Sequence, residues 1–275
     1  MPIYYVDGKF VPAEKAVIPV DDLALLRGIG VFDLLRTHGG KPYFLDAHID
    51  RLENSARKIQ LPLPWSHDEI AAVVQATLAK NDIPEANIRI VVTGGSSTDF
   101  MTPSGKPRLV VLVSPIPKLP DSWYTDGVKI TSWEVERPIP GAKSIDYISA
   151  SLALKKAAAA GAIEALYVDR NGLALECTTS NIFAFVGGRL VTPGRGILSG
   201  VTRKVVLELA EGLFPIEVRD ISRSELQAAD EVFITGTSKG LVPVVQVDDR
   251  TIGSGRPGKH TRQLMTAMQD YTEKH

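Results

Sequence analysis

One stretch of the sequence, from Arg137 to Phe185, constrains the fold more than any other. It begins with a Pro/Gly turn, places Lys143 just before an alanine-rich segment, and continues with two β-type segments joined by Asn171-Gly172. Alanine favours helix, and an Asn-Gly pair between apolar runs is a strong signal for a β-hairpin. We therefore expect a helix, a strand, a tight turn and a second strand that carries Glu176.

The composition limits the classes of protein to which the chain can belong. Its 275 residues suit one large or two small domains, and its formal net charge of −1 gives no electrostatic footprint for nucleic acid or an anionic membrane. Cys177 is the only cysteine, so an intrachain disulfide is impossible. The sequence has neither a secretory signal pattern nor an apolar run long enough to span a bilayer. We expect a cytoplasmic protein that binds neither nucleic acid nor a membrane and holds no metal.

The first part of the chain is typical of a small α/β domain. Apolar runs flank Asp7-Gly8, which predicts a β-hairpin because glycine accepts positive φ. Apolar residues recur at intervals of four and three from Leu45 to Ile59, which predicts a helix with Asp46 as its N-cap. Ser66, followed by Glu69 three residues later, predicts a capping box at the start of a second helix.

A polar edge runs beside the apolar stripe of the first of these helices. It consists of His48, Arg51 and Ser55, spaced so that the three side chains share one side of the helix. From periodicity alone, Arg51 is interpreted as a solvated helix residue.

A proline-rich segment separates two strand-rich halves of the sequence. It reads SPIPKLPDSWYTDG and lies between the predicted strands Arg108–Val113 and Val128–Val135. We therefore predict a domain over 1–118, a linker over 119–127 and a second domain over 128–275. The loop over 94–107 is longer than a plain connector and is typical of a binding loop.

Two turns in the second half are suited to anions. Gly200-Val201-Thr202 opens a predicted helix, whose N-terminal N–H groups and dipole both favour negative charge. The second turn, Gly236–Gly240 with the sequence GTSKG, resembles an anion nest. Together with Lys143 and Glu176, these turns fit pyridoxal phosphate, which needs a lysine for its aldehyde, donors for its phosphate and a carboxylate for its pyridine nitrogen.

Each of these residues also has a plainer interpretation when it is taken singly. Lys143 is equally typical of an exposed residue at a helix start, and Glu176 faces water if its neighbour Leu175 faces the core. The GTSKG turn lacks the length and the lysine placement of a nucleotide-binding P-loop. Nothing in the sequence marks a base that would make Cys177 a nucleophile.

Taken together and in order, the motifs resemble the class IV aminotransferases, the fold type IV pyridoxal phosphate enzymes. The family holds branched-chain and D-amino acid transaminases and aminodeoxychorismate lyase. The motifs are RGIGVFDLLR, HIDRLENSA, LALECTTSNIF, GILSGVTR and DEVFITGTSKG, and they cover nearly the whole chain. The resemblance implies an α/β (α+β) fold with a small N-terminal α/β domain and a larger C-terminal pseudo-barrel domain. It also implies a homodimer whose active sites are shared between the two subunits.

The resemblance assigns roles to individual residues. Lys143 would be the catalytic Schiff-base lysine, and Glu176 would be the partner of the pyridine nitrogen. Tyr147 resembles a tyrosine near the cofactor's phenolic oxygen, although its spacing from the lysine is one residue shorter than in branched-chain enzymes. The other implied cofactor residues are the phosphate ligands Arg51, Val201, Thr202 and Thr237, and Asn181, which would support the cofactor-side strand.

The implied reaction is transamination between an amino acid and a 2-oxo acid, with Lys143 moving the proton. Arg27 resembles an arginine that holds the substrate carboxylate in some D-amino acid transaminases, and Thr178 and Ser238 would shape the substrate pocket. Thr178 and Thr179 stand where one kind of D-specific relative has a second arginine and where the branched-chain pattern has glycines. Arg27 favours a D-amino acid substrate. The alternatives are a branched-chain L-amino acid transaminase, aminodeoxychorismate lyase and a non-catalytic relative that keeps the fold.

Overall fold

The computed structural model describes residues 1–274, which group into two compact units. Unit 1 consists of Met1–Pro117 and Gly141–Tyr147, and unit 2 consists of Lys118–Pro140 and the chain from Ile148 onward. The segment Gly141–Tyr147, which contains Lys143, groups with unit 1 although the sequence predicts it to lie in the second domain. The division into domains stays a prediction. Among the described residues, no helix has the length and apolar character needed to cross a bilayer.

Unit 1 is built on a six-stranded sheet with the strand order β2-β1-β6-β5-β3-β4. The predicted hairpin is confirmed: Asp7 and Gly8 join the first two strands with φ of 45° and 91°. Both values are positive, which is what a two-residue hairpin turn of this kind requires. The strands are β1 (Ile3–Val6), β2 (Lys9–Pro12), β3 (Gly30–His38), β4 (Lys41–Pro42), β5 (Ala86–Thr93) and β6 (Arg108–Pro115).

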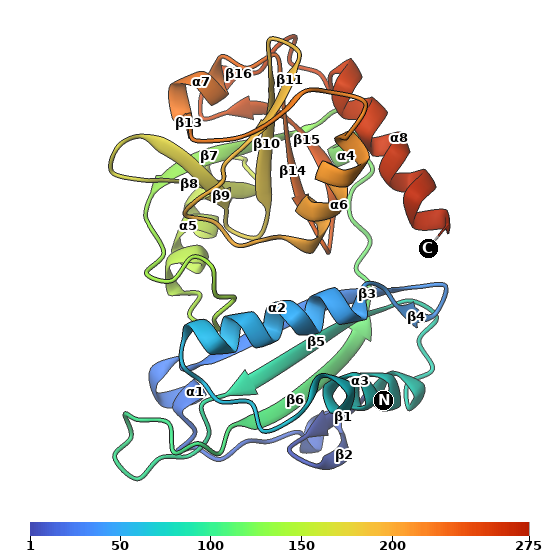
Figure 1. Cartoon of the computed structure of the whole chain (residues 1–275), viewed down its shortest axis with the longest axis vertical. Helices are drawn as coiled ribbons and strands as arrows, with labels where there is room; N and C mark the ends of the chain where they lie inside the picture. The colour runs from blue at the N-terminus through green and yellow to red at the C-terminus, as the bar shows by residue number, and fades with distance from the viewer. Residues whose placement is uncertain (275) are drawn as a thin grey trace. The chain divides into compact units, whose positions relative to one another are not determined.

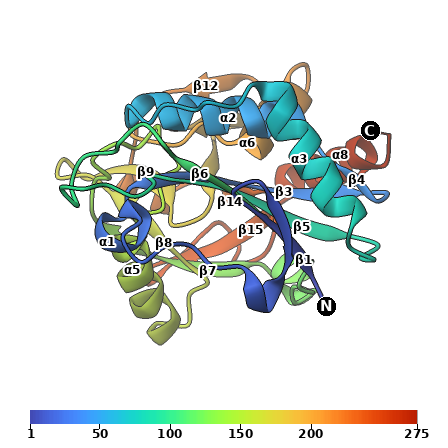
Figure 2. The ribbon, with the colours of Figure 1, turned by 90° about the horizontal axis from the view of Figure 1, so that it is seen from below.

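Two helices, α2 (Leu45–Lys58) and α3 (His67–Ala79), cover one face of this sheet (Figure 2). The capping box of Ser66 and Glu69 at the start of α3 is confirmed. The prediction of Asp46 as the cap of α2 is wrong, because the helix begins one residue earlier, behind a left-handed Phe44 at φ 55° that makes no side-chain cap. The smaller helices of unit 1 are η1 (Ala13–Lys15) and α1 (Leu23–Arg27).

Unit 2 contains a ten-stranded sheet that curls into a half-barrel (Figure 1). Its main path is β12-β11-β10-β14-β15-β7-β8-β9-β13, and β16 pairs with β15. The strands are β7 (Val128–Glu134), β8 (Glu164–Val168), β9 (Leu173–Cys177), β10 (Asn181–Val186), β11 (Arg189–Thr192), β12 (Ile216–Val218), β13 (Ile221–Ser222), β14 (Glu231–Gly236), β15 (Gly240–Val247) and β16 (Arg250–Thr251).

Both faces of the central strands of unit 2 are buried. On β10, Ile182 and Ala184 belong to the core cluster on one face, whereas Phe183 and Phe185 pack with residues of two helices on the other. A side chain on either face of such a strand is therefore removed from water. The helices of unit 2 are α4 (Ser122–Thr125), α5 (Ile148–Ala159), α6 (Val201–Ala210), α7 (Arg223–Gln227) and α8 (Lys259–Lys274).

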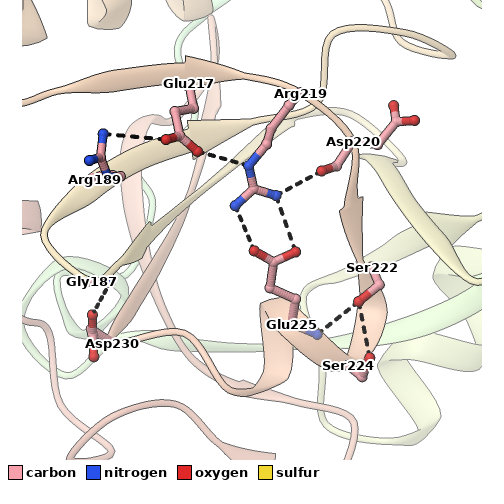
Figure 3. Close-up of polar contacts among 9 residues, drawn as sticks. All are labelled: Gly187, Arg189, Glu217, Arg219, Asp220, Ser222, Ser224, Glu225 and Asp230. Carbon is pink, nitrogen blue, oxygen red and sulfur yellow. Dashed lines mark hydrogen bonds and ion pairs between the residues drawn. The ribbon is translucent and has the colours of Figure 1, made fainter.

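A partly exposed polar network joins the region of β12 to α7 in unit 2 (Figure 3). Arg219 donates from Nε to Glu217 at 2.9 Å and from Nη2 to Glu225 at 2.6 Å. Ser222 caps α7 by accepting a hydrogen bond from the Glu225 N–H. Arg219 therefore joins the end of β12 to the first turn of α7 through two carboxylates.

Candidate functional site

In unit 1, three hydrogen bonds of the backbone hold the segment Lys143–Ile145 against β3 and α2. The Lys143 carbonyl accepts from the Phe32 N–H at 2.9 Å, and the Lys143 N–H donates to Ser55 Oγ at 3.0 Å. Two residues later, the Ile145 N–H donates to the Gly30 carbonyl at 3.1 Å. A Cβ on Gly30 would lie 2.7 Å from the Val92 carbonyl oxygen and 2.9 Å from Ile145 Cδ1, so this close approach requires glycine.

One buried ring, that of Phe32, gathers three side chains of unit 1. Lys143 Nζ lies 4.6 Å from the centre of the ring, and the guanidinium carbon of Arg89 lies 4.8 Å from it. Tyr147 packs edge-on against the same ring at 5.5 Å between centroids. Cations are attracted to aromatic faces, so the ring collects positive charge around Lys143. Sequence reasoning missed Arg89, because a charged residue at an outward position of an alternating strand carries no functional signal.

Arg51 is held by a buried carboxylate. Its Nε and Nη2 donate to the two oxygens of Asp33 at 2.8 Å and 2.7 Å, and His48 Nδ1 lies 2.7 Å from Asp33 Oδ1. Ser55 donates from Oγ to the Arg51 carbonyl at 2.7 Å and accepts from the Lys143 N–H. The predicted polar edge of α2 therefore joins Arg51 to Lys143, and the interpretation of Arg51 as a solvated residue is wrong.

The charges in this cluster follow from burial. Burial raises the pKa of Asp33, but the charge and hydrogen bonds of Arg51 and the hydrogen bond from His48 outweigh it and bring the pKa well below its usual range. Burial, together with the charges of Arg51 and Lys143, lowers the pKa of His48 although Asp33 acts in the opposite direction. At neutral pH, Asp33 is therefore ionised and His48 is neutral. Arg51 Nη1 has no hydrogen-bond partner within residues 1–274, so it can donate a hydrogen bond to an anion.

In unit 2, Glu176 is buried on β9 and makes defined contacts. Its Oε2 accepts from the Leu198 N–H at 3.0 Å, and its Oε1 accepts from Arg137 Nε at 3.0 Å. Asn181 Nδ2 donates to the Leu198 carbonyl at 2.8 Å, so Leu198 is held on both sides of its backbone. The interpretation in which Glu176 faces water is wrong, because both faces of this part of the sheet are covered.

The N-terminus of α6 is the first of the two turns predicted to bind an anion, and it is called the cradle below. The N-cap, Gly200, provides no side-chain cap, so the N–H groups of the first turn are left for an outside acceptor. Val201 and Thr202, the first two residues of the helix, are each 9% exposed. A Cβ on Gly200 would lie 2.0 Å from Asn181 Oδ1, so any larger residue would displace Asn181.

The second anion turn lies next to the first. Thr237 and Ser238 are half-buried in the hairpin turn between β14 and β15, where Gly236 pairs with Gly240. Asn181 pairs with Thr235, so the start of β10 lies beside the end of β14. Because Asn181 also contacts the segment before α6, unit 2 brings together Glu176, Asn181 and both predicted anion turns.

The two predicted substrate residues outside this group have different surroundings. Thr178 is buried, and its Oγ1 donates to Glu164 Oε2 at 2.9 Å. Arg27 is the last residue of α1 in unit 1, where its exposed side chain donates from Nη1 to the Leu26 carbonyl at 2.9 Å. Gly28 ends this helix in the left-handed conformation at φ 67°. Sequence reasoning missed Arg137, Leu198, Glu164 and Lys239 as polar partners, because their contacts join residues far apart in the chain.

Comparisons with known proteins agree on one family. The family model for amino-transferase class IV matches residues 30–247. The chain is 37% identical to a putative branched-chain-amino-acid aminotransferase of Methanocaldococcus jannaschii, over 98% of this chain and 96% of the relative. It is 30% identical to a D-alanine aminotransferase of Listeria monocytogenes, over 94% and 92%. The structure of the Escherichia coli branched-chain amino acid aminotransferase has a TM-score of 0.91 at 27% identity, covering 98% of this chain and 94% of that one. The T.th. branched-chain amino acid aminotransferase with pyridoxamine 5'-phosphate gives the same TM-score, identity and coverage.

Proposed function

The chain belongs to the class IV aminotransferases, and we propose that it transfers the amino group of a D-amino acid to a 2-oxo acid. The family depends on pyridoxal phosphate, and this chain is a transaminase of that family. The choice of substrate and the roles of the residues below are our proposal. The observation that carries the residue roles is the buried Glu176 carboxylate. It accepts a hydrogen bond from the Leu198 N–H, just before the N-terminus of α6, which has no side-chain cap.

The described residues fit pyridoxal phosphate. Glu176 is a buried carboxylate that could face a pyridine nitrogen, and the first turn of α6, which has no side-chain cap, could bind a phosphate. Arg51 keeps one nitrogen available for an anion, while Val201, Thr202 and Thr237 offer backbone or hydroxyl donors. We assign Arg51, Val201, Thr202 and Thr237 to the phosphate. We assign Glu176 to the pyridine nitrogen, with Asn181 holding the strand beside it and Tyr147 near the phenolic oxygen.

When bound, the cofactor supplies a protonated ring that takes up the electrons left when the substrate's Cα loses its proton. Glu176 keeps the pyridine nitrogen protonated, because a buried negative charge stabilises a neighbouring positive one. Arg137 and the Leu198 N–H hold the Glu176 carboxylate in one orientation. Lys143 Nζ accepts the proton from the substrate's Cα and returns it on the same face, with its backbone fixed by Phe32 and Ser55.

Substrate choice is assigned through Arg27. An arginine can hold a carboxylate by two parallel hydrogen bonds, and the exposed Arg27 guanidinium is available to do so. Thr178 and Ser238 are proposed to shape the substrate pocket. The hydroxyl of Thr178 donates a hydrogen bond to Glu164, which fixes the position of the Thr178 side chain. A branched-chain L-amino acid is the second candidate, because the relative at 37% identity and the two structural neighbours above are described as branched-chain enzymes.

We also propose that the chain works in the cytoplasm as a homodimer with shared active sites. Leu25 and Leu26, next to Arg27, are 63% and 37% exposed, and neighbouring exposed leucines are typical of a covered interface. Sedimentation equilibrium of the purified protein is expected to give twice the chain mass. A monomer at micromolar concentration would contradict the dimer.

One set of assays tests the proposed function. The purified protein is expected to take up pyridoxal phosphate with a visible absorbance band that Lys143→Ala abolishes. Each enantiomer of alanine and of leucine is then offered with 2-oxoglutarate, and aminodeoxychorismate is offered alone. Faster turnover of D-alanine supports the proposal. Faster turnover of L-leucine makes the second candidate correct, and consumption of aminodeoxychorismate alone would contradict transamination.

A further inference from the structure

Unit 2 contains a buried ion pair whose basic member, Lys239, has no role in the reaction described above. Glu164 begins β8, Lys239 lies in the turn between β14 and β15, and their side chains are 2% and 9% exposed. Removing two charges from water is costly, so a buried pair is weak evidence of a stabilising role. We therefore ask how the ion pair fixes the geometry of the two turns that it joins, the turn after β9 and the turn between β14 and β15.

The Glu164 carboxylate holds the turn that follows Glu176. Its Oε2 accepts from Thr178 Oγ1 and from the Thr179 N–H, each at 2.9 Å. Its Oε1 accepts from Thr179 Oγ1 and Ser180 Oγ, each at 2.7 Å. Four donors from three consecutive residues therefore converge on one carboxylate and fix the turn between β9 and β10.

Lys239 connects this turn to the turn that carries Thr237. Its ammonium group donates to Glu164, to Thr179 Oγ1 at 2.8 Å and to Ser180 Oγ at 3.1 Å, which uses all three of its protons. Its own N–H donates to the Gly236 carbonyl at 3.1 Å and closes the turn. Burial raises the pKa of Glu164, but the charge of Lys239 and the surrounding hydrogen bonds outweigh it and lower the pKa, so Glu164 is ionised.

We propose that Glu164 and Lys239 are positioning residues for the cofactor. The ion pair sets the place of the phosphate-side turn, with Thr237, relative to the strand that ends in Glu176 and Cys177. Without this ion pair, the distance between Thr237, which is assigned to the phosphate, and the Glu176 carboxylate, which is assigned to the pyridine nitrogen, would no longer be fixed. This inference rests on the proposed function, because both ends of the cofactor are assigned there.

The test compares cofactor binding by the full chain and its variants. Protein stripped of cofactor is titrated with pyridoxal phosphate and, separately, with pyridoxal, which lacks the phosphate. Lys239→Met is expected to weaken binding of pyridoxal phosphate by about tenfold or more, since it leaves Glu164 buried and unpaired. Binding of pyridoxal is expected to change far less, because Glu164 still holds the turn after Glu176. Lys239→Gln replaces Lys239→Met if the latter does not fold.

A double variant and a matched control complete the test. Glu164→Gln with Lys239→Met is expected to lose no more affinity than the weaker-binding single variant, because each change breaks the same link. Glu225→Gln removes a partly exposed ion pair of unit 2 (Figure 3) and is expected to bind both ligands like the wild type. Unchanged pyridoxal phosphate binding in Lys239→Met, equal losses for both ligands, or additive losses in the double variant would each overturn the inference. A wild type that binds neither ligand would instead overturn the proposed function.

Discussion

At the scale of single residues, the site depends on charges that are buried beside specific partners. Glu176 illustrates this, because the alternation of LALEC predicts an outward side chain, yet the structure buries it. Its partners, Arg137 and Leu198, lie 39 and 22 positions away in the chain. The role of the residue was accessible through family motifs, but its environment depends on contacts that no local pattern encodes.

Replacing Glu176 with glutamine keeps its shape and removes its charge. A neutral partner no longer holds the pyridine nitrogen protonated, so kcat is expected to fall by about a hundredfold or more. Glu217→Gln, in the partly exposed network of the same unit, is the control and is expected to keep wild-type kcat. Single-turnover kinetics with the preferred amino acid measure the effect. Wild-type turnover in Glu176→Gln would remove Glu176 from the proposed mechanism.

The proposed role of Arg27 gives a second prediction at this scale. If Arg27 holds the substrate carboxylate, Arg27→Ala loses a charge-assisted contact of about 1.5–3 kcal/mol, so KM should rise by about 10–100-fold. The absorbance of the bound cofactor should stay unchanged. Steady-state kinetics with both enantiomers check this, and an unchanged KM would remove the support for a D-amino acid substrate.

At the scale of elements, local signals succeeded where a few neighbouring residues decide the structure. The hairpin at Asp7-Gly8 and the capping box at Ser66 depend only on turn and cap chemistry, and both are present. The prediction of Asp46 as the N-cap of α2 failed because Phe44 takes a left-handed conformation, which its residue type does not predict. Strand β15 was not predicted because Pro243 lies in its interior, which normally argues against a central strand; a register irregularity follows at Val244.

The start of α6 allows a steric test of the phosphate cradle. Gly200 has φ −71°, so alanine fits the backbone, but its Cβ would lie 2.0 Å from Asn181 Oδ1. The methyl group would displace Asn181, which holds the Leu198 carbonyl just before α6, so Gly200→Ala should shift the first turn of α6 and weaken pyridoxal phosphate binding by about tenfold. Glu208→Ala, farther along the same helix, is the control. Equal affinity in Gly200→Ala and wild type, measured by titration, would show that no ligand uses the cradle.

The contact between β3 and α2 makes the stability of unit 1 depend on pH. The pKa of Asp33 and that of His48 are both lower in the folded protein, so the unfolded chain binds more protons as the pH falls. Stability is therefore full above the unfolded pKa of His, about 6.5, and declines as the pH falls below it. Urea denaturation at a series of pH values should show this decline, and His48→Gln should flatten its upper part. An equally steep decline in His48→Gln would contradict the assignment.

At the scale of the whole molecule, the sequence predicted the two-part α/β plan because its motifs follow one another in the family's order. The assignment of Lys143 to a part of the fold could not be predicted this way. Its segment follows strand β7 of unit 2 along the chain, yet it pairs with Gly30 and Phe32 of unit 1. The place of this segment in unit 1 depends on backbone pairing between residues far apart in the chain. The positions of prolines and the local composition, which predicted the domain boundary, do not reveal such pairing.

The account as a whole depends on one covalent attachment, at Lys143. The most direct measurement is borohydride reduction of the protein loaded with pyridoxal phosphate, followed by proteolysis and mass spectrometry of the modified peptide. We predict that the pyridoxyl group is found on Lys143 and on no other lysine, including the buried Lys239. Modification at a different lysine, or none after saturation with the cofactor, would contradict the account.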